Sequence, residues 1–333
     1  MAVGTPTPLS IWAVSDGRAG IEGQVVGLAQ AIAAHTPAEI ALKHVRYKAL
    51  VAALPAQLNP LPRAGLADPS QIAPPWPDLW VAAGRASLPL SIRVKRWSRG
   101  RTFVVQLQDP RLPPSLFDLV IPPRHDRLFG DNVFPIIGSP HRVTPQRLAA
   151  DLPRFAAAID LLPRPRVAVL IGGTSKAFDL SSERASEMAR LIREGVEAAR
   201  GSVLVTFSRR TPERARSLIA ARLRDLPGQI WSGDGDNPYF AYLAAADAVL
   251  VTEDSTNMAA EAAATGKPVF VLKMDGTSEK FARFHRELED AGAARPYDGA
   301  LYSWSYTPLD ETGRAAEEVL RRLESHGASR NHR

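Results

Sequence analysis

A short polar segment in the last third of the sequence holds the strongest candidates for ligand binding. Ser255, Thr256 and Asn257 follow the apolar run 248–252 and begin an alanine-rich segment with helical spacing. The first N–H groups of such a helix and the positive end of its dipole attract anions, a diphosphate among them. Glu261 would lie about one turn further along, where its carboxylate could accept both hydroxyls of a ribose. The plainer alternatives are an N-cap at Ser255 or Thr256 and a Glu261 that faces solvent.

A glycine-rich loop, Gly172-Gly173-Thr174-Ser175, follows the apolar run 167–171. Glycine lets a backbone approach a phosphate closely, and the two hydroxyls add donors. Strand-to-helix turns also contain glycine for purely structural reasons, so that alternative stays open. The loop has neither the Gly-Lys-Ser/Thr ending of a Walker loop nor the G-x-G-x-x-G of a dinucleotide-binding turn.

Two arginines, Arg209 and Arg210, follow the apolar run 203–207. Guanidinium groups bind diphosphates through charge-assisted, bidentate hydrogen bonds, so this pair could stabilise a departing diphosphate. Arg209 is the preferred ligand of the two. The alternative is that both side chains are solvated at the start of the next helix.

Three residues in the first half of the chain are candidates for proton transfer, and each follows a predicted strand. Asp16 could be a general base or could order its own loop. Asp109 is a second candidate base, although an Asp-Pro pair also favours a simple turn. His125 has an ordinary pKa of about 6.5, which suits proton transfer, but a single loop histidine is more often structural.

Metal and thiol chemistry are not expected. The sequence contains no cysteine, which excludes disulfides and thiolate ligands and fits a reducing compartment. It has no His-x-x-x-His pair, and Asp234 with Asp236 is a weak pattern of oxygen ligands. No metal ion and no bound cofactor are therefore predicted.

The elements that carry these residues alternate between short apolar runs and helical periodicity, which predicts parallel sheets covered by helices. Ligands bind beyond the carboxyl ends of such strands, where the candidate residues lie. The predicted fold class is α/β with two Rossmann-like domains, and Gly20 and Gly23 are placed in the loop before the first helix. The predicted strands span residues 11–15, 79–83, 103–107, 119–121, 167–171, 203–207, 248–252 and 268–272, and the predicted helices 24–34, 88–97, 182–199, 239–245 and 257–264.

The segment Pro163-Arg164-Pro165 is the predicted hinge between the two domains. Residues 1–162 would form an N-terminal Rossmann-like domain on the acceptor side. Residues 163–310 would form a C-terminal Rossmann-like domain on the nucleotide-sugar side. Residues 311–333 would form a helix and tail that could pack back on the N-terminal domain.

Composition limits the partners of the chain. Its 333 residues are 45% hydrophobic and carry a net charge of +6, but no apolar run approaches the roughly 20 residues that span a bilayer. The charge suits a solvated basic surface, peripheral contact with anionic membrane, or phosphate-bearing ligands. Nucleic acid is not expected, because the basic residues are spread along the chain. The first ten residues lack a signal peptide, so we expect a cytoplasmic protein, with the inner face of the membrane left open.

The segment 248–268 resembles the nucleotide-sugar site of GT-B glycosyltransferases. In those enzymes a Ser/Thr-rich turn and a helix N-terminus hold the diphosphate, and a glutamate placed like Glu261, ahead of Gly266-Lys267-Pro268, holds the ribose. Gly172-Gly173-Thr174-Ser175 resembles their glycine-rich interdomain loop. The resemblance implies two domains facing a cleft and a leaving diphosphate stabilised by helix dipoles and cations instead of a metal.

A closer resemblance covers almost the whole chain. Its motifs resemble a bacterial family named after a plant mitochondrial fission factor, the ELM-one-like proteins. This resemblance implies a GT-B-like fold without fixing one activity. The motifs are Ser15-Asp16-Gly17-Arg18-Ala19-Gly20, Gln106-Leu107-Gln108-Asp109-Pro110-Arg111, Ser208-Arg209-Arg210-Thr211-Pro212, Asp236-Asn237-Pro238-Tyr239, Val251-Thr252-Glu253-Asp254-Ser255 and Lys280-Phe281.

The leading functional hypothesis is a glycosyltransferase that uses a nucleoside-diphosphate sugar as substrate and acts on a cell-envelope or small-molecule acceptor. A nucleoside-diphosphate-sugar epimerase on the same site is the first alternative. The second is a non-catalytic, fission-factor-like adaptor at a membrane surface. The basic and apolar segment 280–286 allows membrane attachment, although it also fits an amphipathic helix packed on its own domain.

Overall fold

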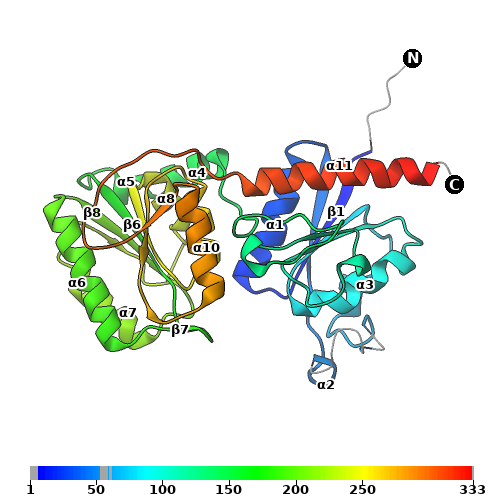
Figure 1. Ribbon diagram of the computed structural model, residues 1–333, viewed down its shortest axis with the longest axis horizontal. Coiled ribbons are helices and arrows are strands. Elements are labelled where there is room, and N and C mark those ends of the chain that lie inside the picture. Colours follow the sequence, from blue (N-terminus) through cyan, green and yellow to red (C-terminus); the bar gives the residue numbers. More distant parts are fainter. Residues whose placement is uncertain (1–6, 53–58, 60–61, 332–333) are drawn as a thin grey trace, which may run out of the picture. The chain divides into compact units, whose positions relative to one another are not determined.

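The computed structural model describes residues 7–52, 59 and 62–331. The chain forms two compact units. The first comprises Met1–Arg142 together with Asp310–Arg333, and the second comprises Val143–Leu309. Figure 1 shows the elements of each unit, labelled in chain order.

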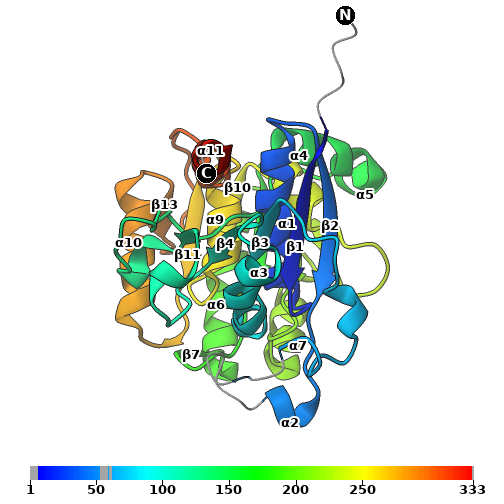
Figure 2. The same ribbon diagram turned by 90° about the vertical axis from the view of Figure 1, so that its right-hand side faces the viewer.

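The first unit is built on a five-stranded parallel sheet in the order β2-β1-β3-β4-β5. Alternate residues of a strand point to opposite faces, so Ile11 and Ala13 of β1 face one core and Trp12 and Val14 the other. Helices α1 and α11 cover the first face, and α3 covers the second (Figure 2). The bounds are β1 Leu9–Ser15, α1 Ala19–Ala33, β2 Ala38–His44, α2 Ala49–Ala52, β3 Leu79–Ala82, α3 Leu88–Trp97, β4 Phe103–Leu107, β5 Leu119–Ile121 and α11 Glu311–Asn331.

The second unit is built on a six-stranded parallel sheet in the order β13-β11-β10-β6-β8-β9. Strands β7 and β12 form a separate two-stranded antiparallel sheet. The bounds are α4 Pro145–Asp151, α5 Ala156–Ile159, β6 Arg166–Ile171, β7 Phe178–Asp179, α6 Ser182–Ala198, β8 Ser202–Phe207, α7 Glu213–Leu223, β9 Gly228–Ile230, α8 Tyr239–Ala245, β10 Ala248–Thr252, α9 Thr256–Ala263, β11 Val269–Leu272, β12 Asp275–Gly276, α10 Glu279–Asp290 and β13 Ala294–Pro296.

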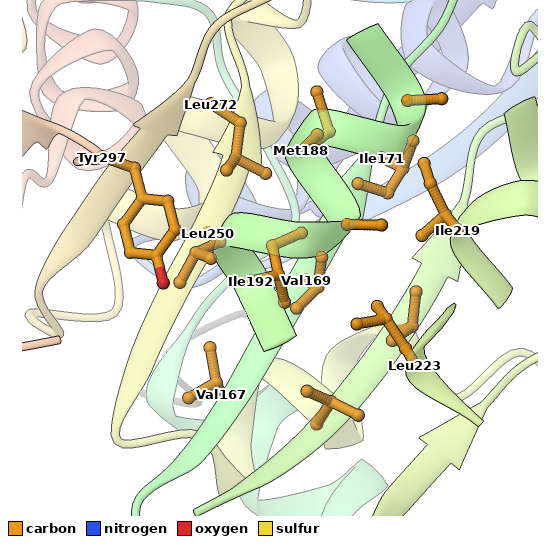
Figure 3. Packing of buried hydrophobic residues seen from close by; sticks show 14 of the residues in the cluster. Val167, Val169, Ile171, Met188, Ile192, Ile219, Leu223, Leu250, Leu272 and Tyr297 are labelled. Atoms are coloured by element: carbon orange, nitrogen blue, oxygen red, sulfur yellow. The ribbon is translucent and has the colours of Figure 1, made fainter. Parts of the chain in front are cut away.

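The core of the second unit lies between this sheet and helices α6 and α7. Figure 3 shows Val169 and Ile171 of β6 packed against Met188 and Ile192 of α6. Ile192 is completely buried, as are both strand residues. Burial of each such side chain stabilises the unit by about 1.5–3 kcal/mol before conformational entropy is counted. This core fixes the strands whose carboxyl ends carry the polar loops.

Most of the predicted elements are confirmed, with one correction at the first helix. Gly20 and Gly23 were expected in a loop, yet both lie within α1, which begins at Ala19. The N–H groups of Ile21 and Glu22 already donate to the carbonyl of Arg18, so the helix starts before the apolar spacing does.

The division between the units also differs from the predicted boundary at residue 162. Residues 143–162 belong with the second unit, because α4 and α5 pack against α8. The Arg147 guanidinium lies 4.8 Å from the ring centroid of Phe240, and Arg154 pairs with Asp236 at 2.6 Å. Helix α11 packs on the first unit through Ala315, Ala316 and Val319, all completely buried. No helix of the described residues is long and apolar enough to cross a membrane.

Candidate functional site

Three polar loops meet at one edge of the second unit's sheet. Strands β10, β6 and β8 are neighbours and run parallel, so their carboxyl ends lie at the same edge. The loops that follow them are 253–255, 172–175 and 208–212. Hydrogen bonds between these loops join them into one structure, and its centre is a residue to which sequence reasoning gave no role.

That central residue is Asp254, whose side chain is fully buried. Its Oδ2 accepts hydrogen bonds from the Gly173 N–H at 3.0 Å and from Arg210 Nη2 at 2.7 Å. Its Oδ1 accepts the Thr252 hydroxyl at 2.7 Å. One carboxylate therefore connects the loops after all three strands, and a buried charge bonded in this way is costly to disturb.

Packing accounts for the glycines of the glycine-rich loop, in agreement with the structural alternative that the sequence left open. A Cβ atom on Gly172 would collide with the Asp254 carboxylate, and one on Gly173 would collide with the backbone of Arg210. The Gly172 N–H donates to the Thr252 hydroxyl and the Gly173 N–H to Asp254.

The other two amides of this loop are also used within the protein. The Thr174 N–H donates to the Arg210 carbonyl at 3.2 Å, and the Ser175 N–H to the Phe178 carbonyl at 2.8 Å. The backbone N–H groups of residues 172–175 therefore all have acceptors within the protein. A ligand role of these four residues stays a prediction.

The two arginines after β8 have different surroundings. Arg210 reaches into the loop network, where its guanidinium also bonds the carbonyls of Gly173 and Thr174 at 3.3 and 3.2 Å. Arg209 is exposed, and it makes no hydrogen bond or ion pair with any residue that the structure describes. Arg209 is thus the arginine whose charge a ligand could use, while Arg210 has a structural role that the sequence did not reveal.

Helix α9 begins at the same edge, with Ser255 as its N-cap. The Ser255 hydroxyl accepts the Met258 N–H at 3.3 Å, so the capping alternative is confirmed for this residue. Thr256 is the first helical residue, and its N–H donates to no described acceptor. Thr256 and Asn257 are half-buried. The first turn of α9 therefore presents a donor and the positive end of the helix dipole at this edge.

Glu261 lies further along α9 and is half-buried. Its Oε2 accepts a hydrogen bond from the Tyr239 hydroxyl at 2.5 Å, a contact that periodicity alone could not predict. Burial, and then the Glu261 charge, raise the pKa of Tyr239 well above its usual value, so Tyr239 stays a neutral donor. Tyr239 begins α8, where its N–H bonds Asn237 Oδ1 at 3.0 Å. Glu261 is thereby held toward the start of α8.

A second buried carboxylate, that of Glu253, orders the loop after β11. Its Oε1 accepts the Met274 N–H at 2.6 Å, and Lys273 Nζ lies 3.3 Å from its Oε2. The Glu253 carbonyl bonds His285 Nε2 of α10 at 2.8 Å, and burial lowers the pKa of this histidine. The apolar face of α10 packs inward, with Phe281 against Phe178 at 5.2 Å between ring centroids. The segment 280–286 therefore packs on its own unit, which is the plainer of the two expectations.

The three candidates for proton transfer lie in the first unit. Asp16 Oδ2 bonds Arg18 Nη2 at 2.7 Å, and Asp109 Oδ2 bonds Arg111 Nε at 2.9 Å. Each carboxylate also accepts the backbone N–H of the same arginine, at 3.1 and 2.8 Å respectively. These contacts favour the loop-ordering alternative for both aspartates. His125 is only 2% exposed, with Nε2 3.9 Å from Asp126 Oδ1, which favours a structural role.

The described residues contain no group of three or more histidine, aspartate or glutamate side chains placed to hold a metal ion. The donors at the edge of the second sheet are a helix N-terminus, hydroxyls and one uncommitted guanidinium. Such groups bind anions.

Comparison with known sequences finds one family model and two relatives. The family model described as Mitochondrial fission ELM1 matches residues 19–323. Mitochondrial fission protein ELM1 of Arabidopsis thaliana is 32% identical over 280 residues, which cover 76% of this chain and 65% of the plant protein. The chain therefore spans just under two thirds of that relative's length. An uncharacterized protein of Rickettsia prowazekii is 27% identical, and the match covers 93% of this chain and 98% of that protein.

Comparison with solved structures identifies the fold. A putative UDP-N-acetylglucosamine 2-epimerase from Listeria monocytogenes matches with a TM-score of 0.62 and 14% identity, over 96% of this chain and 97% of that one. The UDP-GlcNAc 2-epimerase of Neisseria meningitidis, bound to UDP-GlcNAc, matches with a TM-score of 0.55 and 13% identity, over 95% and 99%. The predicted fold class, α/β with two Rossmann-like domains of the GT-B type, is confirmed.

Proposed function

The chain belongs to the mitochondrial fission ELM1 family, and from this premise we propose that its second unit binds a nucleoside-diphosphate sugar and that the protein transfers the sugar to an acceptor. The observation that carries the proposal is the edge formed by the first turn of α9 and Glu261. The Thr256 N–H and the dipole of α9 would hold the diphosphate, and Arg209 would add a positive charge. The Glu261 carboxylate, held by Tyr239, would accept the ribose hydroxyls.

The chemistry of the edge favours glycosyl transfer. In that reaction the bond between the anomeric carbon and the diphosphate oxygen breaks, and the electron pair stays on the diphosphate. An acceptor oxygen bonds the same carbon, and its proton passes to solvent or to the departing diphosphate. The donors at this edge stabilise the charge that develops on the departing diphosphate, and such preorganised donors are worth several kcal/mol of barrier.

A nucleoside-diphosphate-sugar epimerase is the second candidate, supported by the names of the solved structures that share the fold. Incubation with UDP-, GDP- and ADP-sugars distinguishes the two. A transferase releases nucleoside diphosphate in proportion to acceptor, whereas an epimerase converts the sugar without needing an acceptor. Mass spectrometry and NMR of the products report which occurs.

Binding itself is tested by calorimetric titration with the same panel of nucleotide sugars. We expect one member to bind, and we expect Glu261→Ala to weaken its binding on the order of tenfold to a hundredfold, since a charge-assisted hydrogen bond is lost. Glu289→Ala, an exposed glutamate on α10, is the matched control and should bind as the parent does. Folded protein that binds no member of the panel would contradict the proposal.

A further inference from the structure

The first unit carries a cationic feature of its own. Each of the five strands of its parallel sheet is followed, within four residues, by an exposed arginine. The strands β1, β2, β3, β4 and β5 end at Ser15, His44, Ala82, Leu107 and Ile121, and the arginines are, in the same order, Arg18, Arg46, Arg85, Arg111 and Arg124. Because all five strands are parallel, these arginines follow one edge of the sheet, which we call the arginine edge.

Contacts around two glycines place two members of the arginine edge beside neighbouring loops. Arg46 Nη2 lies 3.7 Å from the position that a Cβ atom on Gly17 would take, which is in the loop after β1. Arg18 Nη2 lies 3.7 Å from the corresponding position on Gly84, which is in the loop after β3. The side chains of Arg46 and Arg18 therefore each reach the loop of a neighbouring strand.

Two members of the arginine edge are held in place by the same pair of contacts to an aspartate. Arg18 and Arg111 each follow an aspartate by two residues, and each bonds it through both its backbone N–H and its guanidinium. The arginine side chains nevertheless remain 67% and 79% exposed. Asp16 and Asp109 thus orient guanidinium groups that still face solvent, which lowers the entropy cost of using them to bind a ligand.

The remaining members carry charge that the described residues do not neutralise. Arg46, Arg85 and Arg124 make no ion pair with any residue in the described ranges. The other titratable groups at this edge are engaged elsewhere. Glu22 bonds His44 at 2.7 Å, and Asp126 is buried beside His125.

The second unit's sheet does not share this pattern. Of its six strands, β8 alone is followed within four residues by an arginine, whereas β10 is followed by Glu253 and Asp254.

We propose that the arginine edge binds the phosphate or pyrophosphate group of a phosphorylated ligand. Guanidinium groups recognise phosphate oxygens through paired N–H donors, and the carboxyl edge of a parallel sheet is where such folds bind ligands. The same phosphate chemistry is offered by a soluble phosphorylated molecule and by a lipid headgroup. The residues that carry this proposal all belong to the first unit, whereas those assigned to the nucleotide sugar belong to the second.

The test is calorimetric titration of the full chain with inorganic pyrophosphate. We expect binding that weakens with added salt, and a loss on the order of tenfold or more in the double variant Arg18→Gln/Arg111→Gln. The double variant Arg85→Gln/Arg124→Gln should also lose affinity, and it breaks no ion pair with a described residue, so it should not disturb folding.

Two controls separate this site from general charge. Arg96→Gln removes an exposed arginine of α3, and Arg224→Gln removes an arginine of the second unit whose side chain is 75% exposed. Both should bind pyrophosphate as the parent does. Unchanged affinity in the two edge variants, or an equal loss in the two controls, would overturn the proposal.

A vesicle experiment distinguishes the two sources of phosphate. The chain is sedimented with phosphatidylcholine vesicles that contain or lack phosphatidic acid. Pelleting that requires phosphatidic acid and is lost in Arg18→Gln/Arg111→Gln identifies a lipid phosphate. Pyrophosphate binding without pelleting identifies a soluble ligand. Absence of both would refute the site.

Discussion

At the scale of single residues, Asp254 explains more of the site than any residue chosen for its chemistry. Its buried carboxylate bonds the Gly173 N–H, the Thr252 hydroxyl and the Arg210 guanidinium. The adjoining loop requires its two glycines because this carboxylate and the Arg210 backbone occupy the space that a side chain would need. Contacts within the protein therefore fix the arrangement of the loops before any ligand binds.

Replacing Asp254 with alanine should destabilise the protein by about 2–3 kcal/mol, because a buried N–H and a buried hydroxyl would lose their acceptor. Arg210 is 47% exposed and can be resolvated, which keeps the loss below that of a fully buried pair. Urea unfolding measures the change. Asp225→Ala is the control, since its side chain is 67% exposed, and it should alter stability by no more than about 0.5 kcal/mol. An equal effect of the two variants would contradict the role given to Asp254.

Lys267 provides a test by pH. Its Nζ donates to the carbonyls of Leu243 and Ala244 near the end of α8, and burial lowers its pKa from 10.5 to about 8. Between about pH 8 and 10.5 the unfolded chain binds the proton that the folded chain has released, so stability due to this residue rises with pH in that window. The parent's free energy of unfolding minus that of Lys267→Met should increase by up to about 3 kcal/mol between about pH 8 and pH 10.5. A flat or falling difference would refute this assignment.

At the scale of elements, the first turn of α9 is the feature on which ligand binding depends. Thr256 is its first residue, a position that tolerates proline, and Ser255 before it is extended, with φ −114° and ψ 92°. Thr256→Pro therefore removes one N–H donor while leaving the helix intact. We expect the affinity for a nucleoside diphosphate to fall on the order of tenfold, with little change in thermal stability.

The control for this change is Thr256→Ala, which keeps the backbone donor and loses only the hydroxyl. It should retain most of the affinity measured by calorimetry. If Thr256→Ala and Thr256→Pro lose affinity equally, the hydroxyl and not the N–H contacts the ligand. If neither loses any, the first turn of α9 is not the diphosphate site.

The central strands of each sheet can be predicted well from the sequence and the edge strands poorly, for a physical reason. Strands such as β6, β8 and β10 are buried on both faces and read as continuous apolar runs. Strand β2 is an edge strand with exposed and half-buried residues and a mixed sequence, so it was missed, as were the short strands β9 and β13. The polar loops were located because they follow buried strands, but their internal contacts were not.

The candidate site shows the same limit at Glu261. Helical spacing places it one turn into α9, but the contact of its carboxylate with Tyr239 joins residues that are 22 positions apart in the chain, which spacing does not reveal. Asp16 and Asp109 were identified as notable because each follows a strand. Their pairing with Arg18 and Arg111 depends on side-chain conformations that residue types alone do not specify.

At the scale of the whole molecule, the chain consists of two α/β units that carry different candidate binding residues. The second unit offers a helix N-terminus with Glu261, and the first offers the arginine edge. If both proposals hold, a nucleotide-sugar donor in one unit and a phosphorylated molecule in the other would give a transferase both of its substrates.

The C-terminal helix completes the first unit even though it follows the second in sequence. Val319 of α11 is completely buried, and the Glu311 carboxylate accepts the Ile137 N–H at 2.7 Å. Val319→Asp should lower the thermal stability of the first unit strongly, because it buries an unpaired carboxylate. Glu317→Ala, at an exposed position of the same helix, should leave the melting temperature nearly unchanged. Equal melting of Val319→Asp and the parent would show that α11 does not contribute to that core.

The most direct measurement of the central claim is a crystal structure of the protein soaked with UDP. A solved structure that shares the fold contains bound UDP-GlcNAc. The account predicts the diphosphate within hydrogen-bonding distance of the Thr256 N–H, with the ribose hydroxyls on the Glu261 carboxylate. A diphosphate bound elsewhere, or a Glu261 that keeps only its bond to Tyr239 while the nucleotide occupies another part of the chain, would contradict it.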